Sequence, residues 1–295
     1  LVQVPHQSHA AGERVKCTYI EIPQVAETYE HIGSKLWWAF GYEHGMNEYG
    51  VAIGNEAVAS KEPYQWGDGL LGMDLVRLGL ERGRTAREAL DLGCNLNLAP
   101  VLDLYALADA TVIGDRSMGA DAAQVAVHGL AYLQGARRAG IAAAVKHFPG
   151  HGRTTVDTHQ RLAVLDVDGE TLWAQDLLPF RLAIEAGVEA VMTAHILYPR
   201  LDPQFPATLS EKIVRGLLRG RLGFEGVVIS DDIEMGALMK SFSTREILKR
   251  SILAGVDIVL EFGGLDALKL IEELKRLLES GELTPELIEE GARRV

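Results

Sequence analysis

Residues 146–159 read KHFPGHGRTTVDTH and hold three histidines, one lysine and one aspartate. Histidine titrates near neutral pH, so it can both donate and accept a proton during a reaction. Asp157 stands two residues before His159, and a neighbouring carboxylate can orient an imidazole ring and stabilise its protonated form. An isolated Asp-x-His pair would be typical of a surface loop with no such role.

A metal site is a second interpretation of the same stretch. His147 and His151 are four residues apart, but Pro149 and Gly150 lie between them. The two rings would therefore not share a helix face, which is the usual way in which histidines at this spacing bind a metal. No glycine-rich phosphate-binding string occurs in the sequence. We expect neither a metal nor another cofactor.

The segments that must position these residues alternate between strand and helix from about Asn95 onward. Near-continuous apolar strands are buried on both faces, which predicts a parallel sheet and an α/β fold. Helices are expected in 121–140, 169–187, 210–223, 243–255 and 265–281, and Ser210 is a suitable N-cap. Strands are expected in 95–103, 141–150, 188–196, 226–232 and 256–262.

Each of these strands ends in polar or ionisable residues: Asp103, Lys146 with His147, His195, Asp231 with Asp232, and Glu261. In a (β/α) TIM-type barrel, the active site lies at the carboxyl ends of the strands. An open doubly wound sheet could do the same at one crevice, from fewer strands. About five units are recognisable and a closed barrel has eight, so we predict an α/β barrel that is incomplete.

Residues 1–94 differ in pattern from the rest of the chain. Partly alternating segments such as TYIEI and GVAIG suit antiparallel pairing. Leu71, Leu75 and Leu78 have helical spacing, and Thr85 with Glu88 forms a capping box. We therefore expect two domains, an α+β segment over residues 1–90 and the barrel over residues 91–295, with few side-chain contacts between that segment and the catalytic rim.

The composition limits the kinds of partner that the chain can bind. The chain has 295 residues, a formal net charge of −12 and a pI of about 5.2. A diffuse acidic surface argues against nucleic acid and anionic membranes as partners. No apolar run approaches a membrane span, and no signal peptide is visible. Cys17 and Cys94 lie in apolar runs, which is typical of buried thiols in a reducing compartment. We expect a cytoplasmic protein.

Several motifs carry a resemblance to a known family: APVLD, DRSMGAD, KHFPGHGRTTVDTH, MTAHILYP and PATLSEKIVRGLLRGRLGFEGVVISDDIEM. From about residue 91 to the end, the chain resembles glycoside hydrolase family 3, in its bacterial β-N-acetylhexosaminidase branch. The resemblance implies a β/α barrel that releases terminal β-linked N-acetylglucosamine, typically from cell-wall muropeptides, with retention of configuration. The expected partner is then a small carbohydrate substrate.

The resemblance also implies roles for individual residues. Asp231 is the candidate nucleophile, and His159 is the candidate acid/base, oriented by Asp157, with Thr158 where serine is more usual. Arg116, Lys146 and His147 would bind sugar hydroxyls. Some have a plain structural alternative. Asp231 or Asp232 could cap the next helix, a role that we assign to Asp232, and Arg116 could be a solvated loop residue. His195 is expected either to line the same site or to be a hydrogen-bonded core residue.

The N-terminal segment carries a second resemblance. VKCTYIEIPQV, NEYGVAIGNEAV and GLLGMDLVRLGLERGRTAREAL resemble the secernin/C69 dipeptidase family, whose nucleophile is an N-terminal cysteine. Position 1 is leucine and Cys17 is internal, so this part is expected to be chemically silent. The string DQEGGR, typical of the glycosidase family, is absent. The alternatives to an active glycosidase are therefore a catalytically silent chimeric or truncated barrel, whose open sheet edges would permit self-association, and an N-terminal-nucleophile dipeptidase.

Overall fold

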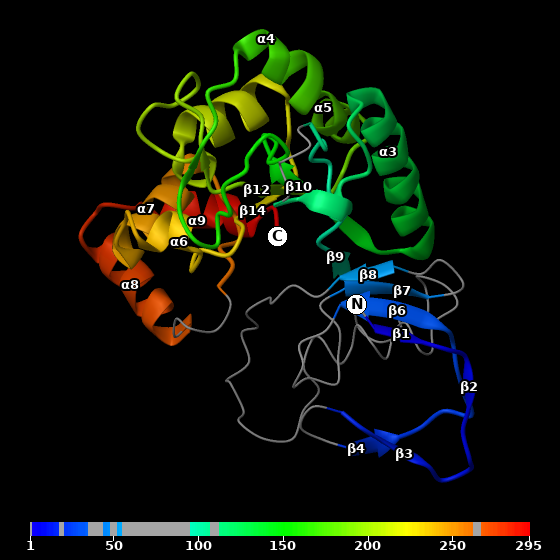
Figure 1. Ribbon diagram of the computed structural model, residues 1–295. Coiled ribbons are helices and arrows are strands. Elements are labelled where there is room, and N and C mark those ends of the chain that lie inside the picture. The colour runs from blue at the N-terminus through cyan, green and yellow to red at the C-terminus, as the bar shows by residue number, and fades with distance from the viewer. Residues whose placement is uncertain are drawn as a thin grey trace. The chain divides into compact units, whose positions relative to one another are not determined.

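The computed structural model in Figure 1 describes residues 2–17, 21–34, 44–47, 52–54, 95–106, 112–261 and 267–295. The chain divides into two compact units. Unit 1 comprises Leu1–Leu98 with Gly135–Ala142, and unit 2 comprises Ala99–Gln134 with Ala143–Val295.

Unit 1 is built from short antiparallel strands. Strands β1 (Val2–Val4), β6 (His31–Ser34), β7 (His44–Asn47) and β8 (Ala52–Gly54) form one sheet in that order, while β2 (Gln7–Ser8) pairs with β5 (Glu27–Thr28) and β3 (Arg14–Lys16) with β4 (Glu21–Pro23). The expected antiparallel pairing is thus confirmed for the described parts of TYIEI and GVAIG. Cys17 is buried, as predicted. The helix expected around Leu71–Leu78, the Thr85–Glu88 capping box and Cys94 lie outside the described residues.

A parallel sheet forms the centre of unit 2. Strands β10 (Ala142–Phe148), β12 (Ala190–Thr193) and β14 (Val227–Ile229) are adjacent, with Val145 opposite Val191 and Val191 opposite Val228. Parallel bridges from Val101 to Lys146 and from Ile229 to Ile258 extend the sheet on both sides. The strands therefore lie side by side in the same order as in the chain.

Burial agrees with this arrangement. All four residues of β12 are buried, and only the first residue of β10 is partly exposed. A strand that is buried on both faces needs apolar side chains throughout, which explains the continuous AAAV and AVM runs. The predicted α/β class with a parallel sheet is confirmed. The segment 256–262 is less regular than predicted, because within its described residues only the bridge at Ile258 joins the sheet.

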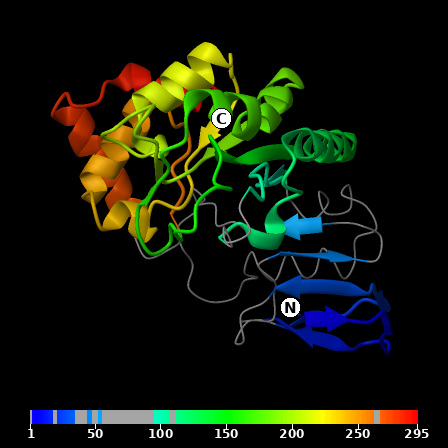
Figure 2. The ribbon, with the colours of Figure 1, turned by 45° about the horizontal axis from the view of Figure 1, so that its top comes forward.

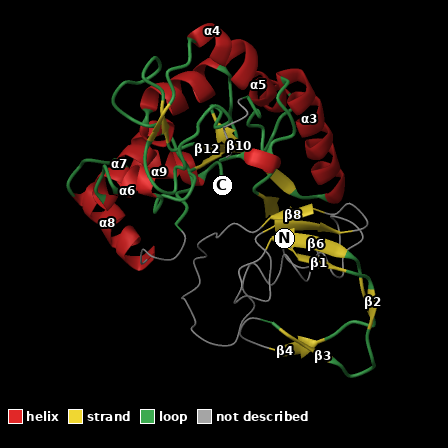
Figure 3. Cartoon of the chain, viewed as in Figure 1, coloured by secondary structure: helices red, strands yellow, loops and turns green. Residues whose placement is uncertain are grey.

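Helices and short turns connect the strands of unit 2. Figure 3 and the turned view of Figure 2 show these helices arranged around the parallel sheet. Their bounds are η1 Gly114–Arg116, α3 Ala122–Ala139, α4 Gly169–Thr171, η2 Leu172–Asp176, α5 Leu178–Glu185, η3 Ala207–Leu209, η4 Lys212–Arg221, α6 Gly236–Met239, α7 Thr244–Ala254, α8 Ala267–Glu279 and α9 Pro285–Ala292. Two short strands, β11 (Ala163–Val164) and β13 (Ile196–Leu197), pair in parallel. None of the helices in the described part of the chain is long and apolar enough to cross a membrane.

The helix ends follow local sequence signals. Asp121 accepts a hydrogen bond from the Gln124 amide at the start of α3, and Gly140 follows its end with a φ of +79°. Such a φ favours glycine, because a Cβ would clash there. Ser210 Oγ accepts from the Ile213 amide at 3.2 Å, so Ser210 does serve the first turn of the segment that continues as η4. Helices α6, α7 and α8 share a core with η3, built around Leu209, Leu238, Ile247 and Leu277.

Candidate active site

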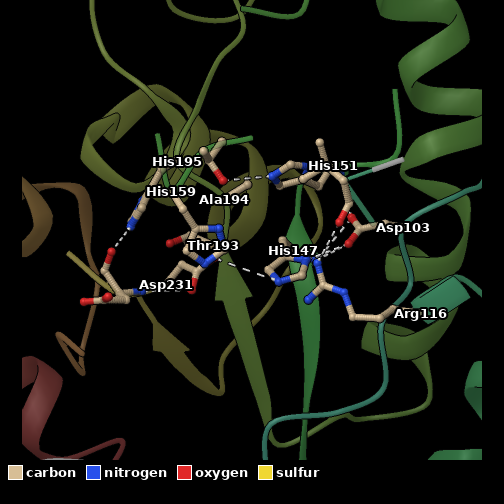
Figure 4. Close-up of polar contacts among 12 residues, drawn as sticks. Asp103, Arg116, His147, His151, His159, Thr193, Ala194, His195 and Asp231 are labelled. Carbon is tan, nitrogen blue, oxygen red and sulfur yellow. Dashed lines mark hydrogen bonds and ion pairs between the residues drawn. The ribbon is translucent and has the colours of Figure 1, made fainter. Parts of the chain in front are cut away.

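The polar strand ends of unit 2 meet around His147. Its Nδ1 lies 2.6 Å from Oδ2 of Asp103, and its Nε2 lies 3.9 Å from Oδ2 of Asp231. Asp103 follows the bridge at Val101, His147 lies near the end of β10 and Asp231 follows β14. Figure 4 shows the His147 ring between the other two side chains. Carboxyl ends of parallel strands meet on one side of a sheet. The distances from His147 to Asp103 and Asp231 show that these three strand ends do meet.

Asp103 is the buried centre of this arrangement. Its carboxylate accepts hydrogen bonds from the His147 ring, from the His147 amide at 3.2 Å and from the His151 amide at 2.6 Å. Burial by itself would raise the pKa of Asp103. The interactions with His147 and His151 outweigh burial and hold the pKa below its usual value, so the group is ionised. An ionised carboxylate accepts hydrogen bonds only, which places the Nδ1 proton on His147.

Asp231 is the other carboxylate that faces His147, and its side chain is 19% exposed. Burial would raise its pKa, but interactions with His147 and His195, the Asp232 amide at 2.9 Å and the charge of Lys146 lower it instead. Asp231 is therefore a carboxylate at neutral pH and is accessible from the site. Those are the two properties that a carboxylate nucleophile requires.

Asp157 and His159 form a second polar pair. Oδ1 of Asp157 accepts from the His159 amide at 2.9 Å and lies 2.8 Å from His159 Nδ1. Burial opposes ionisation of Asp157, but the bonds from His159 together outweigh it and lower the pKa of the carboxyl group. The Nδ1 of His159 is thereby held toward Asp157. The side chain of His159 is 70% exposed, so its ring is accessible from solvent.

Lys146 and Arg116 differ in how firmly they are placed. Lys146 is buried beside His147, and its charge contributes to the lowered pKa of Asp231, so it belongs to the site. Arg116 is exposed at the end of η1 and donates to the Val112 carbonyl at 3.2 Å. Ser117 holds its loop, because Ser117 Oγ donates to the Asp103 carbonyl at 2.7 Å.

His195 is a hydrogen-bonded core residue. Its Nε2 lies 2.8 Å from the Asp232 carbonyl and its Nδ1 lies 2.8 Å from Thr208 Oγ1. A carbonyl only accepts, so Nε2 carries the proton, while burial lowers the pKa of the ring and keeps it neutral. Of the two interpretations left open, the core role is the one observed, although His195 also influences Asp231. Its bond to the Asp232 carbonyl fixes the backbone next to Asp231.

The expected capping role of Asp232 is wrong. Helix α6 begins at Gly236 and has Met235 as its N-cap, without a side-chain bond. Asp232 Oδ1 accepts from the Glu234 amide at 3.0 Å, and so closes a local turn directly after β14. The physical reason is distance along the chain, because a cap must immediately precede the first helical residue and Asp232 stands four residues before it.

Three further residues shape the site and were assigned no role from sequence. They are Asp103, which was seen only as a strand end, His151 and Thr158. His151 and Thr158 are both buried, and His151 Nε2 lies 3.1 Å from Thr158 Oγ1. A buried threonine between two exposed polar residues gives no signal in a single sequence. Among the residues that the structure describes, no group of three or more His, Cys, Asp or Glu side chains is placed to hold a metal.

Comparison with known proteins identifies similar chains. Residues 78–295 match the family model described as the glycosyl hydrolase family 3 N-terminal domain. A beta-hexosaminidase of Xylella fastidiosa is 44% identical over 175 residues, which cover 59% of this chain and 51% of that protein. Beta-hexosaminidase LpqI of Mycobacterium tuberculosis is 37% identical over 224 residues, which cover 74% of this chain and 56% of that protein. The chain thus spans about half the length of these curated relatives.

Solved structures give the same result. A glycoside hydrolase family 3 beta-N-acetylglucosaminidase from Paenibacillus superposes with a TM-score of 0.69 at 42% identity, covering 71% of this chain and 40% of that one. The beta-N-acetylglucosaminidase from Thermotoga maritima superposes with a TM-score of 0.64 at 39% identity, covering 71% of this chain and 44% of that one.

Proposed function

This chain belongs to glycosyl hydrolase family 3, and from that premise we propose that it hydrolyses terminal β-linked N-acetylglucosamine from glycosides such as cell-wall muropeptides. The names of the similar proteins support this substrate class. The observation that carries the proposal is the pair of carboxylates with distinct settings: Asp231, ionised and facing His147, and Asp157, bound to an exposed histidine. Glycoside hydrolysis with retention needs a nucleophile and a separate proton donor.

Asp231 and His159 would share the two steps of the reaction. In the first step, an Asp231 oxygen forms a bond to the anomeric carbon, the bond from that carbon to the leaving oxygen breaks, and His159 donates a proton to that oxygen. In the second step, His159 removes a proton from water, whose oxygen forms a bond to the anomeric carbon and releases Asp231. Asp157 stabilises the imidazolium form that His159 has before the first proton transfer and regains in the second.

Lys146, His147 and Arg116 would bind the hydroxyl groups of the sugar. Lys146 and His147 lie at the end of β10 beside Asp231, where a sugar bound for attack must also lie. Asp103 holds His147 through Nδ1, so Nε2 is the atom left to face the substrate. Contacts of this kind contribute to the rate when they strengthen in the transition state. No metal or other cofactor is part of the proposed reaction.

The architecture that we propose for this unit is an incomplete TIM-type barrel, with residues 91–295 as its domain. The order of Val101, β10, β12, β14 and Ile258 across the sheet, which follows the chain, supports a barrel over a doubly wound sheet, where the order reverses. We propose that residues 1–90 are a secernin/C69-like segment without its nucleophile. Open sheet edges would then permit self-association. The setting that we propose is the cytoplasm, and we expect neither nucleic acid nor a membrane as a partner.

The alternative to an active enzyme is a catalytically silent, chimeric or truncated barrel. The absence of a DQEGGR string supports it, because that string belongs to an acidic strand end that holds the sugar in the resembled family. We therefore expect weaker turnover than that of a complete family member. An N-terminal-nucleophile dipeptidase has no support among the described residues, where the one described cysteine, Cys17, is internal and buried.

Turnover of a chromogenic N-acetyl-β-glucosaminide tests the proposal. Asp231→Asn removes the carboxylate that forms the covalent intermediate, so no turnover should remain. The neighbouring Asp232→Asn keeps an oxygen that can accept from the Glu234 amide, so its activity should persist. The opposite ranking would refute Asp231 as the nucleophile. Absence of turnover in the unaltered chain would favour the silent barrel.

A further inference from the structure

The loop that carries the acid/base pair has a buried residue at its centre. Asp157 and His159 have side chains that are 40% and 70% exposed, whereas Thr158 between them is 2% exposed. The exposed pair is thus attached to the unit through a side chain that points inward. The position of Thr158 therefore fixes where the two functional side chains emerge.

Three hydrogen bonds hold this loop to two other parts of unit 2. Thr158 Oγ1 lies 3.1 Å from His151 Nε2, in the segment that follows β10. The carbonyls of Thr158 and His159 each accept, at 3.0 Å, from the amides of Ala237 and Gly236 respectively. Gly236 follows Asp231 by five residues, so the loop of the proposed acid/base is bonded to the segment that follows the proposed nucleophile.

Gly236 permits this contact because it has no side chain. A Cβ at this position would lie 2.5 Å from the Gln160 carbonyl oxygen and 2.8 Å from the His159 carbonyl oxygen. Both neighbours are backbone atoms, which cannot move aside without displacing the loop. Any other residue at position 236 would therefore push the loop away from α6.

His151 connects the loop to the buried centre of the site. Its amide donates to Asp103 Oδ1 at 2.6 Å, and Asp103 also holds His147. Burial, with a further contribution from His147, lowers the pKa of the His151 ring to about 4, so the ring is neutral at neutral pH. Among the described residues, the bond to Thr158 is the only hydrogen bond of that ring, since its Nδ1 has no partner there.

We propose that His151, Thr158 and Gly236 are positioning residues that hold the Asp157–His159 pair in the geometry for proton transfer to a substrate attacked by Asp231. This inference rests on the proposed glycosidase function. We call these three residues the latch. The Thr158 hydroxyl is held by the His151 ring, and the loop carbonyls are held by the amides of Gly236 and Ala237. A group that must transfer a proton within hydrogen-bonding reach loses rate when its position is loosened.

Thr158→Val separates positioning from folding, because valine keeps the shape of threonine and replaces only the hydroxyl with a methyl group. With a phenyl N-acetyl-β-glucosaminide, whose leaving group needs a proton, kcat/KM should fall about 10-fold or more. With the dinitrophenyl analogue, whose leaving group departs as an anion, kcat/KM should change less than about 2-fold, because the first step no longer needs the acid. Thr158→Ser retains the hydroxyl and should restore the rate with the phenyl substrate.

A second variant tests the coupling to His151. His151→Leu removes the same hydrogen bond from the other side, and should produce the same selective loss with the phenyl substrate. Adding Thr158→Val to His151→Leu should then cause little further loss, since the bond is already absent. Independent losses that multiply in the double variant would show that the two residues do not act through their mutual bond and would overturn the latch.

Hydrogen exchange tests the latch without any turnover. The amides of Gly236 and Ala237 are protected by the loop carbonyls, so they should exchange about 10-fold or more faster in Thr158→Val and in Gly236→Ala. The amides of β10 and β12 should keep their unaltered rates. Gly216→Ala in η4 is the matched control for Gly236→Ala, because its Cβ would meet only the Glu211 carbonyl, at 3.7 Å.

The outcomes distinguish this inference from the proposed function. If the unaltered chain turns over neither substrate, the glycosidase proposal fails, and exchange at Gly236 and Ala237 still decides whether the latch exists. Equal losses with both substrates, or exchange that rises throughout the sheet, would show a merely structural role for Thr158. Unchanged exchange at these amides in Thr158→Val would also overturn the proposal.

Discussion

His147 Nδ1 lies 2.6 Å from Oδ2 of Asp103, and Asp103 is almost wholly buried. The bond sets the direction of the imidazole ring, because an ionised carboxylate can only accept a hydrogen bond and so the proton stays on Nδ1 of His147. The opposite ring nitrogen is then directed toward Asp231, 3.9 Å away. Asp103, whose side chain is fully buried, thus determines how His147, a candidate substrate-binding residue, faces the proposed nucleophile.

Asp103→Asn should therefore destabilise the fold. The carboxylate accepts three N–H groups, and an amide would place its own N–H₂ against one of these donors. We expect a loss of about 2–4 kcal/mol in the free energy of unfolding, measured by denaturant titration. Asp166→Asn, which weakens an exposed ion pair to Arg200, is the control and should have little effect. An equally small effect at Asp103 would contradict the role given to it.

His159→Ala should slow turnover by roughly 10²–10⁴ for a substrate whose leaving group needs a proton. The loss in kcat/KM should shrink for leaving groups that depart as anions. His128→Ala, on the exposed face of α3, is the control for removing a histidine. Rates that fall equally for all leaving groups would indicate that His159 does not act as the acid.

The sequence was sufficient to predict features that depend on local patterns. The apolar runs of β10 and β12 predicted a parallel sheet, and the polar residues at the ends of β10 and β14 predicted that His147 and Asp231 would meet. It was insufficient where a role depends on contacts between distant segments. Asp103 and His151 are 48 residues apart, and no periodicity indicates that the amide of one bonds the carboxylate of the other. Asp232 was misassigned because the position at which α6 begins is not marked in the sequence.

In the FPGHG segment, we predict that Gly152 tolerates no side chain, because the backbone of Leu104 lies against it. A Cβ on Gly152 would lie 1.8 Å from the Leu104 carbonyl oxygen, so Gly152→Ala must displace the chain beside Asp103. We expect it to lower the melting temperature and to reduce turnover. Gly135→Ala is the matched control, because nothing lies within 4 Å of its Cβ in helix α3. Alanine is the better helix former by about 0.5–1 kcal/mol, so this control should raise the melting temperature slightly.

Mild acid should destabilise the fold through His151. The His151 ring has a pKa of about 4 in the folded chain, chiefly because of burial, against an ordinary value of 6.5. Between these values the unfolded chain binds the additional proton, so the free energy of unfolding must fall as the pH is lowered from 6.5 toward 4. The difference of about 2.5 pKa units corresponds to at most about 3.5 kcal/mol, since each pKa unit is worth about 1.4 kcal/mol. The lowered pKa of His195 acts in the same direction.

Denaturant titrations across this pH range measure the effect. His151→Gln removes the titrating ring but keeps a polar group that can reach Thr158, so the slope of stability against pH should become shallower. His128→Gln, at an exposed position of α3, is the control for replacing a histidine. Below about pH 4, the lowered pKa values of Asp103 and Asp231 should cause a further loss, since their contribution is complete above the unfolded value of 3.8 and disappears as these groups are protonated. A slope between pH 4 and 6.5 that is the same in His151→Gln and the unaltered chain would show that this ring is protonated equally in the folded and unfolded states, contrary to its burial.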